Sequence, residues 1–104
     1  EKERGTTYME KLVVPEQNII NAICVHFGRK VNANPEAVEV ELMYDDETGF
    51  SAEAYVNNQQ YNLSTLDIIE SLRQTMREFL NLDPISTGIE LVLDEKEGII
   101  AVVS

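Results

Sequence analysis

The 104-residue sequence has one cysteine, few basic residues and no long apolar run, and each shortage limits what the chain can be. Because Cys24 is single, no disulfide can form within the chain, which favours a reducing cytoplasm as its location. No apolar stretch approaches the roughly 18–20 residues needed to cross a bilayer, so we expect no membrane-spanning segment. A basic start followed by an apolar stretch is also missing, so we expect no secretory signal in this sequence.

Basic residues are scarce, since 8 Lys and Arg stand against 19 Asp and Glu, which gives a formal net charge of −11. From Val31 to Leu72 the sequence contains no Lys or Arg. Nonspecific binding of nucleic acids depends on cations that meet phosphates, so we expect no nucleic-acid partner. Anionic membrane surfaces are disfavoured for the same reason. Cations and basic proteins remain as candidate ligands, beside the simpler interpretation that acidic residues keep the protein soluble.

Apolar residues that recur at helical spacing predict two helices. The first should run from about residue 16 to Gly28. The second begins at Ser64, whose side chain can cap the helix together with Asp67, and ends before Pro84. Its apolar stripe is expected to contain Leu66, Ile69, Leu72, Met76, Phe79 and Leu80.

The stretch AVEVELMYDDETGFSAEAYV is predicted to form two strands joined by an acidic turn, because apolar and polar residues alternate on both sides of DDETG. Two registers keep both apolar sets on one face. In the first, Tyr44 lies opposite Phe50. That register would place Glu41 opposite Glu53, which sets like charges against each other. In the second, Tyr44 lies opposite Ala52 and a bulge follows the turn.

A short third strand near Tyr61 and a second hairpin over residues 89–103 complete the predicted elements. Both faces of this hairpin are apolar except at Glu90, which is typical of central or covered strands. The order α-β-β-β-α-β-β therefore predicts an α+β fold, with a mostly antiparallel five-stranded sheet and two helices on one face. We expect residues 1–8 to be a flexible N-terminal extension and residues 9–104 to be a single domain.

No predicted element remains to cover the second face of this sheet. Exposed apolar side chains on a small domain indicate a partner, most commonly another copy of the same chain. We therefore expect a homo-oligomer, and the leading hypothesis is a non-enzymatic protein-interaction module that self-associates through its open sheet face. The expected interface residues are Met43, Tyr55, Val92, Ile100 and Val102.

Carboxylates share that open face and the turn of the first hairpin. Carboxylate oxygens are ligands that Ca²⁺ and Mg²⁺ prefer, so the alternative hypothesis is a carboxylate-based protein that binds a divalent cation. A basic protein partner could meet the same side chains. The candidate metal ligands are Glu39, Glu41 and Glu53 on the strands and Asp45, Asp46 and Glu47 in the turn.

No arrangement of residues identifies a catalytic centre. Cys24 and His26 are single residues of their kinds. At about 100° per residue they lie roughly 200° apart around the first helix, so they cannot act as a nucleophile and its base. The sequence contains no phosphate-binding glycine loop and no nucleophile elbow. These observations favour a non-enzymatic role without a cofactor.

Two stretches, PEQNIINAIC at 15–24 and VEVELMYDDETGFSAEAYVN at 38–57, resemble the YxcD-like family of small proteins from Bacillus-type bacteria, a domain of unknown function. The resemblance covers most of the chain from Met9 onward. It implies a cytoplasmic bacterial α+β protein. It brings no catalytic residues that could be assigned to positions of this sequence.

Overall fold

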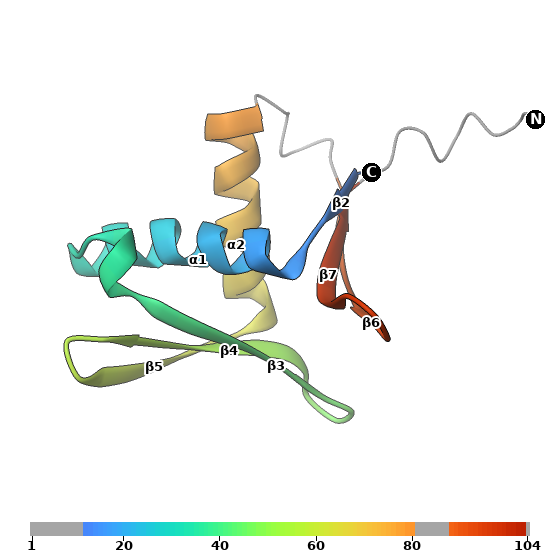
Figure 1. The fold of residues 1–104 in the computed structure, drawn as a ribbon, viewed down its shortest axis with the longest axis horizontal. Helices are drawn as coiled ribbons and strands as arrows, with labels where there is room; N and C mark the ends of the chain where they lie inside the picture. The colour runs from blue at the N-terminus through green and yellow to red at the C-terminus, as the bar shows by residue number, and fades with distance from the viewer. Residues whose placement is uncertain (1–11, 81–87, 104) are drawn as a thin grey trace, which may run out of the picture.

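Two helices and two small antiparallel sheets make up residues 12–80 and 88–103, which are the residues described by a computed structural model (Figure 1). The N-terminal extension expected over residues 1–8 and the helix stop expected before Pro84 lie outside the described residues. In chain order the elements are β2 (Leu12–Val14), α1 (Glu16–Val31), the 3-10 turn η2 (Pro35–Ala37), β3 (Glu39–Asp45), β4 (Gly49–Val56), β5 (Gln59–Leu63), α2 (Thr65–Thr75), the π-helical turn η3 (Met76–Leu80), β6 (Ile89–Asp94) and β7 (Gly98–Val103).

The strands form two three-stranded sheets, β3-β4-β5 and β2-β7-β6, so the prediction of one five-stranded sheet is wrong. The final hairpin does not extend the first sheet because β7 pairs with β2, where Val13 lies opposite Val102. The segment Leu12–Val14 has only three residues, but its backbone N–H and C=O groups can pair with those on the free edge of β7. Backbone polar groups that are left unpaired in a protein interior are costly, so β7 gains from this partner. The α+β class and the antiparallel pairing were predicted correctly.

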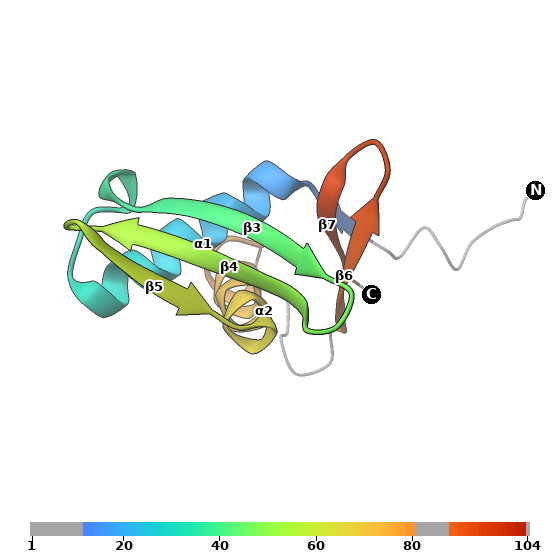
Figure 2. The same ribbon diagram turned by 90° about the horizontal axis from the view of Figure 1, so that it is seen from below.

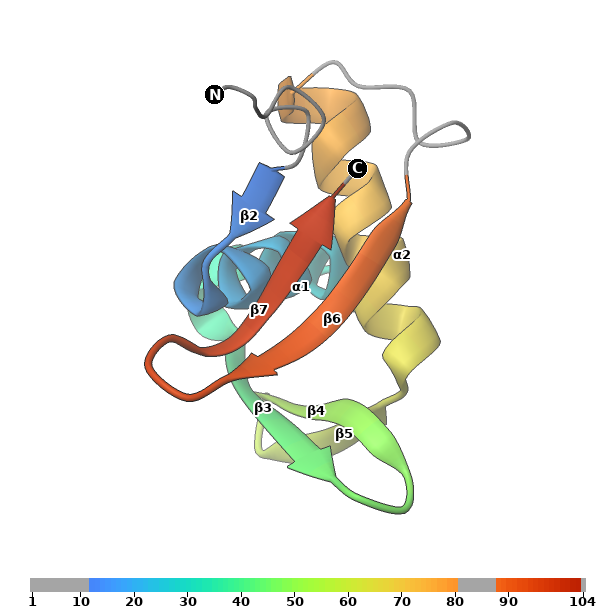
Figure 3. The ribbon, with the colours of Figure 1, turned by 90° about the vertical axis from the view of Figure 1, so that its right-hand side faces the viewer.

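The helices lie between the two sheets and cover one face of each. Seen from below, β3, β4 and β5 spread across α1 and α2 (Figure 2). Seen from the side, β2, β7 and β6 stand in front of both helices (Figure 3). One shared core results, because side chains from both helices and both sheets meet there. Its buried members include Ile19, Ile23 and Phe27 of α1, Ala52, Ala54 and Val56 of β4, Ile68 and Leu72 of α2, and Leu91, Ile99 and Ala101 of the final hairpin.

The first hairpin adopts the first of the two predicted registers. Tyr44 lies opposite Phe50, and their ring centroids are 4.8 Å apart. Gly49 follows the turn with φ of 84°, in the left-handed region that glycine enters without a steric cost. The register therefore places Glu41 opposite Glu53.

Both helices begin where the sequence predicted, whereas α1 ends later than predicted. Ser64 and Asp67 form the predicted capping box of α2. Helix α1 continues past Gly28 to Val31, because Asn32, with φ of 61°, takes the left-handed position that ends the helix.

Within the described residues, no helix is long and apolar enough to span a membrane.

Candidate functional site

The outer face of the β3-β4-β5 sheet carries the carboxylates that the sequence placed there. Glu39 and Glu41 of β3 are exposed, and Glu53 of β4 is half-buried. Both helices lie on the opposite side of this sheet, against Ala52 and Ala54. We call the outer surface the acidic face, and it consists of Glu39, Glu41, Glu53, Tyr55 and Gln60.

Glu53 is the best-connected carboxylate of the acidic face. The Tyr55 hydroxyl donates a hydrogen bond to Glu53 Oε1, and Gln60 Nε2 donates one to Glu53 Oε2 at 3.0 Å. The hydrogen bond to Glu53, with a smaller contribution from burial and the nearby negative charge, raises the pKa of Tyr55 to about 12. The Tyr55 hydroxyl and the Gln60 amide thus stabilise the Glu53 carboxylate. Their hydrogen bonds offset part of the repulsion between Glu53 and Glu41, which lie opposite each other.

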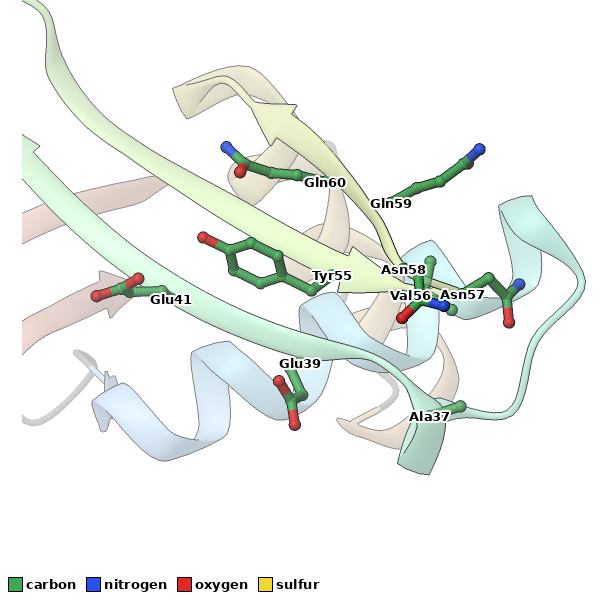
Figure 4. A pocket seen from close by; sticks show the side chains of 9 residues that line it. All are labelled: Ala37, Glu39, Glu41, Tyr55, Val56, Asn57, Asn58, Gln59 and Gln60. Atoms are coloured by element: carbon green, nitrogen blue, oxygen red, sulfur yellow. The ribbon is translucent and has the colours of Figure 1, made fainter.

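A hollow of about 710 Å³ opens at one end of the acidic face (Figure 4). Glu39 and Glu41 approach it from β3, Tyr55 from β4, and Gln60 from β5. The turn Asn57–Asn58 closes its far end, with both residues at positive φ. This surface offers hydrogen-bond acceptors and an aromatic ring, which is the chemistry that binds lysine or arginine side chains.

The predicted metal ligands do not assemble into a metal centre. Across residues 12–80 and 88–103, no three His, Cys, Asp or Glu side chains are grouped so that they could hold a metal ion. In the turn, Asp45 Oδ1 accepts hydrogen bonds from the backbone N–H groups of Glu47, at 2.7 Å, and Thr48, at 3.2 Å. Asp45 therefore supports the turn itself, as aspartates at this position commonly do.

The corresponding aspartate of the second hairpin does the same. Asp94 Oδ1 accepts from the backbone N–H groups of Lys96 and Glu97, at 2.8 and 2.9 Å. These two hydrogen bonds lower the pKa of Asp94, and the bond from Glu97 has the larger effect. The similar sequences DDETG and DEKEG thus form similar turns, each ending in a left-handed glycine.

Cys24 and His26 show no sign of catalytic activation. The Cys24 thiol donates to the backbone carbonyl of Val38 at 3.3 Å, and burial raises its pKa, which disfavours the reactive thiolate. Burial and the neighbouring Lys30 lower the pKa of His26. These shifts fit a small, partly buried thiol and a neutral boundary histidine.

The five predicted interface residues do not share one face, because the single sheet on which they were placed does not exist. Met43 and Tyr55 belong to the first sheet, whereas Val92, Ile100 and Val102 belong to the second. Ile100 is only 8% exposed, so it offers little surface.

The outer face of the second sheet gains a residue that sequence reasoning missed. Val13 lies opposite Val102 in the β2–β7 pair and is 54% exposed. Val92 and Val102 are half-buried on the same face. We call Val13, Val92 and Val102 the valine face. Reading Leu12–Val14 as a pairing strand would have identified Val13.

Comparisons with known proteins support the resemblance seen in the sequence. The profile of a family described as "Protein of unknown function (DUF2653)" matches residues 9–96. A protein of Bacillus subtilis (strain 168), "Uncharacterized protein YxcD", is 39% identical over 94 residues, which cover 89% of this chain and 92% of that protein. No solved structure matches the chain.

Proposed function

The chain belongs to the DUF2653 family, as its resemblance to YxcD-like proteins predicted, and from its surfaces we propose that it is a non-enzymatic protein-interaction module that self-associates through an open sheet face. The observation that carries the proposal is the valine face, an apolar surface built by three neighbouring strands. Its single cysteine supports a cytoplasmic location for this module.

The valine face lies on the side of the second sheet that points away from the shared core. On the inner side, Leu91, Ile99 and Ala101 are buried against the helices. On the outer side, Val102 has Val13 opposite it on one neighbouring strand and Glu90 opposite it on the other. Apolar side chains gathered on an outer sheet face favour a protein partner, because their burial removes apolar area from water.

Self-association fits the valine face better than the acidic face. A two-fold axis places a surface against its own copy, so valines would meet valines on the second sheet. On the first sheet the same operation would place Glu39, Glu41 and Glu53 against three more carboxylates, which repel. Glu90 stands beside Val102, near the end of its strand, where it can stay in water at the rim of such an interface.

Sedimentation equilibrium at tens of micromolar protein tests the proposal. We expect the unaltered chain to show a mass of two or more copies, and Val102→Lys to show the mass of one copy with an unchanged far-ultraviolet circular dichroism spectrum. Glu41→Lys on the acidic face is the matched control and should leave the mass unchanged. A monomeric mass for the unaltered chain would disprove self-association.

The alternative, binding of a divalent cation by carboxylates, keeps one supporting observation, which is the placement of Glu41 directly opposite Glu53. Two carboxylates are fewer than a Ca²⁺ or Mg²⁺ site normally uses. Calorimetry with millimolar Ca²⁺, Mg²⁺ and Mn²⁺ should therefore show no heat of binding. A heat that Glu41→Gln abolishes would favour the cation site instead.

A further inference from the structure

A groove of about 580 Å³ runs between helix α1 and strand β3. The helix contributes Ile20 and Val25 to its walls, and the strand contributes Val40. Glu36 and Glu39 also line it. The groove therefore combines apolar walls with negative charge.

Strand β3 is the edge of its sheet on this side, since β4 is the only described strand with which it pairs. The Cys24 thiol on α1 hydrogen-bonds to the Val38 carbonyl, so that carbonyl points toward the helix and away from β4. In an antiparallel strand, backbone groups that point to one side recur every second residue. The N–H and C=O groups of Val40 and Leu42 thus also point away from β4, and Val40 itself lines the groove.

An edge strand with outward-pointing N–H and C=O groups is a template for one more strand. Recognition of an extended peptide by strand addition works through such an edge, and pockets beside it select alternate side chains. Here one set of alternate side chains of an added strand would meet Ile20 and Val25. The other set would lie on the acidic face beside Glu39 and Glu41.

We propose that this groove binds an extended segment of a basic partner protein, in which apolar residues alternate with Lys or Arg and which adds to the sheet beside β3. The charge argues for a basic segment, because the acidic face presents Glu39 and Glu41 and no Lys or Arg occurs from Val31 to Leu72. The groove lies on the first sheet and the valine face on the second, so this inference does not depend on the proposed self-association.

A second copy of this chain fits the groove less well than a basic segment. Antiparallel pairing of β3 with its own copy would bring Glu39 and Glu41 close to the same carboxylates of the copy. Like charges on neighbouring strands oppose pairing. A basic segment turns the same positions into favourable cross-strand pairs.

A fluorescent nine-residue peptide of alternating lysine and valine, titrated at low salt, is the probe. We expect saturable binding of this peptide. Two control peptides should bind at least tenfold more weakly: one in which glutamate replaces lysine, and one with the lysines and valines of the probe but with all lysines first. Methylating the backbone nitrogens of one alternate set of peptide residues should weaken binding at least tenfold, whereas methylating the other set should not. This contrast identifies strand addition, because charge attraction alone does not depend on which set loses its N–H groups.

Protein variants and amide spectra locate the site. Glu39→Lys and Val25→Arg should each weaken binding at least fivefold, while Glu90→Lys on the second sheet is the control and should leave it unchanged. In ¹⁵N spectra the peptide should shift the amides of Val40 and Leu42 and slow their hydrogen exchange. Equal affinity for both methylated peptides would overturn the proposal. So would slow hydrogen exchange of the Val40 and Leu42 amides in the absence of peptide, because it would mean that a second copy of the chain occupies the edge.

Discussion

Glu41 lies directly opposite Glu53 across strands β3 and β4, so the sheet sets two carboxylates against each other. The turn accounts for this register, since Asp45 accepts two backbone hydrogen bonds within it and Gly49 supplies the left-handed residue that closes it. The ring contact between Tyr44 and Phe50 adds to the same register. These local interactions outweigh the repulsion between Glu41 and Glu53. That repulsion is already weakened by water and by the two neutral hydrogen-bond donors to Glu53.

The hydrogen bond from Tyr55 to Glu53 predicts an alkaline limit to stability. The pKa of Tyr55 is raised from 10.0 to about 12 in the folded protein. Folding therefore favours the protonated phenol, and this contribution is complete below pH 10 and is lost as the pH rises from about 10 to 12. In a ¹³C-tyrosine titration, Glu53→Gln should bring the pKa of Tyr55 back toward 10, whereas Glu39→Gln should not. An unchanged Tyr55 titration in Glu53→Gln would contradict this account.

The two left-handed glycines predict two unequal alanine variants. Gly49→Ala has no atom within 4 Å of the new methyl group, so its cost should be the backbone strain alone, about 1 kcal/mol. At Gly98 the methyl group would lie 3.0 Å from Glu16 Oε2, which also accepts from the Ile99 backbone N–H at 3.4 Å. Since the Glu16 carboxylate can move, we expect Gly98→Ala to cost only about 0.5 kcal/mol more.

Urea denaturation of both glycine variants measures the difference. A Glu16→Ala background should remove most of it, because the methyl group then has no carboxylate to displace. Equal losses in the two variants, with Glu16 present, would show that the contact has no energetic consequence.

The ion pair between Arg29 and Glu78 predicts a loss of stability in acid. Arg29 of α1 donates two hydrogen bonds to Glu78 of η3, at 2.6 and 2.8 Å. Arg29, followed by Gln74, lowers the pKa of Glu78 from 4.5 to about 2. A lowered carboxyl pKa stabilises the fold above the unfolded value, so this contribution should fade as the pH falls from about 4.5 to 2.

Both ends of the pair are accessible to water, so the effect should be small and should shrink in molar salt. Denaturation midpoints at pH 6 and pH 3 should differ less in Glu78→Gln than in the unaltered chain. Arg77→Gln is a suitable control, because Arg77 is only a minor contributor to the Glu78 pKa. An identical acid response in Glu78→Gln would exclude this pair as a source of it.

Helix α2 predicts a contrast between two neighbouring apolar residues. Leu66, which its sequence spacing placed on the buried stripe, is 67% exposed, whereas Ile68 is 1% exposed. Leu66→Ala should therefore change the free energy of unfolding by about 0.5 kcal/mol or less. Ile68→Ala should cost about 2–5 kcal/mol, because it leaves a cavity in the core. Thermal or urea denaturation of the two variants measures this difference in the free energy of unfolding. A large loss of stability in Leu66→Ala would mean that this end of α2 is packed differently.

The amino-acid sequence by itself determined the elements and their local chemistry. Alternation placed Glu39, Glu41 and Glu53 outward and Ala52 and Ala54 inward, because strand side chains alternate by geometry. The Ser64 cap followed from interactions between residues three positions apart. Such signals need no knowledge of the rest of the chain.

Only the tertiary structure decided which strands meet and which helix surface is buried. Every strand edge carries the same N–H and C=O groups, so no local pattern could show that β7 pairs with Leu12–Val14 instead of extending the first sheet. The second sheet then packs on the helices from another side. Helix α2 packs against α1 and the first sheet, so Ser71, 2% exposed, and Ile68 lie inside while Leu66 faces out. Pairing and burial depend on where distant segments lie, and a sequence read in short windows does not contain that information.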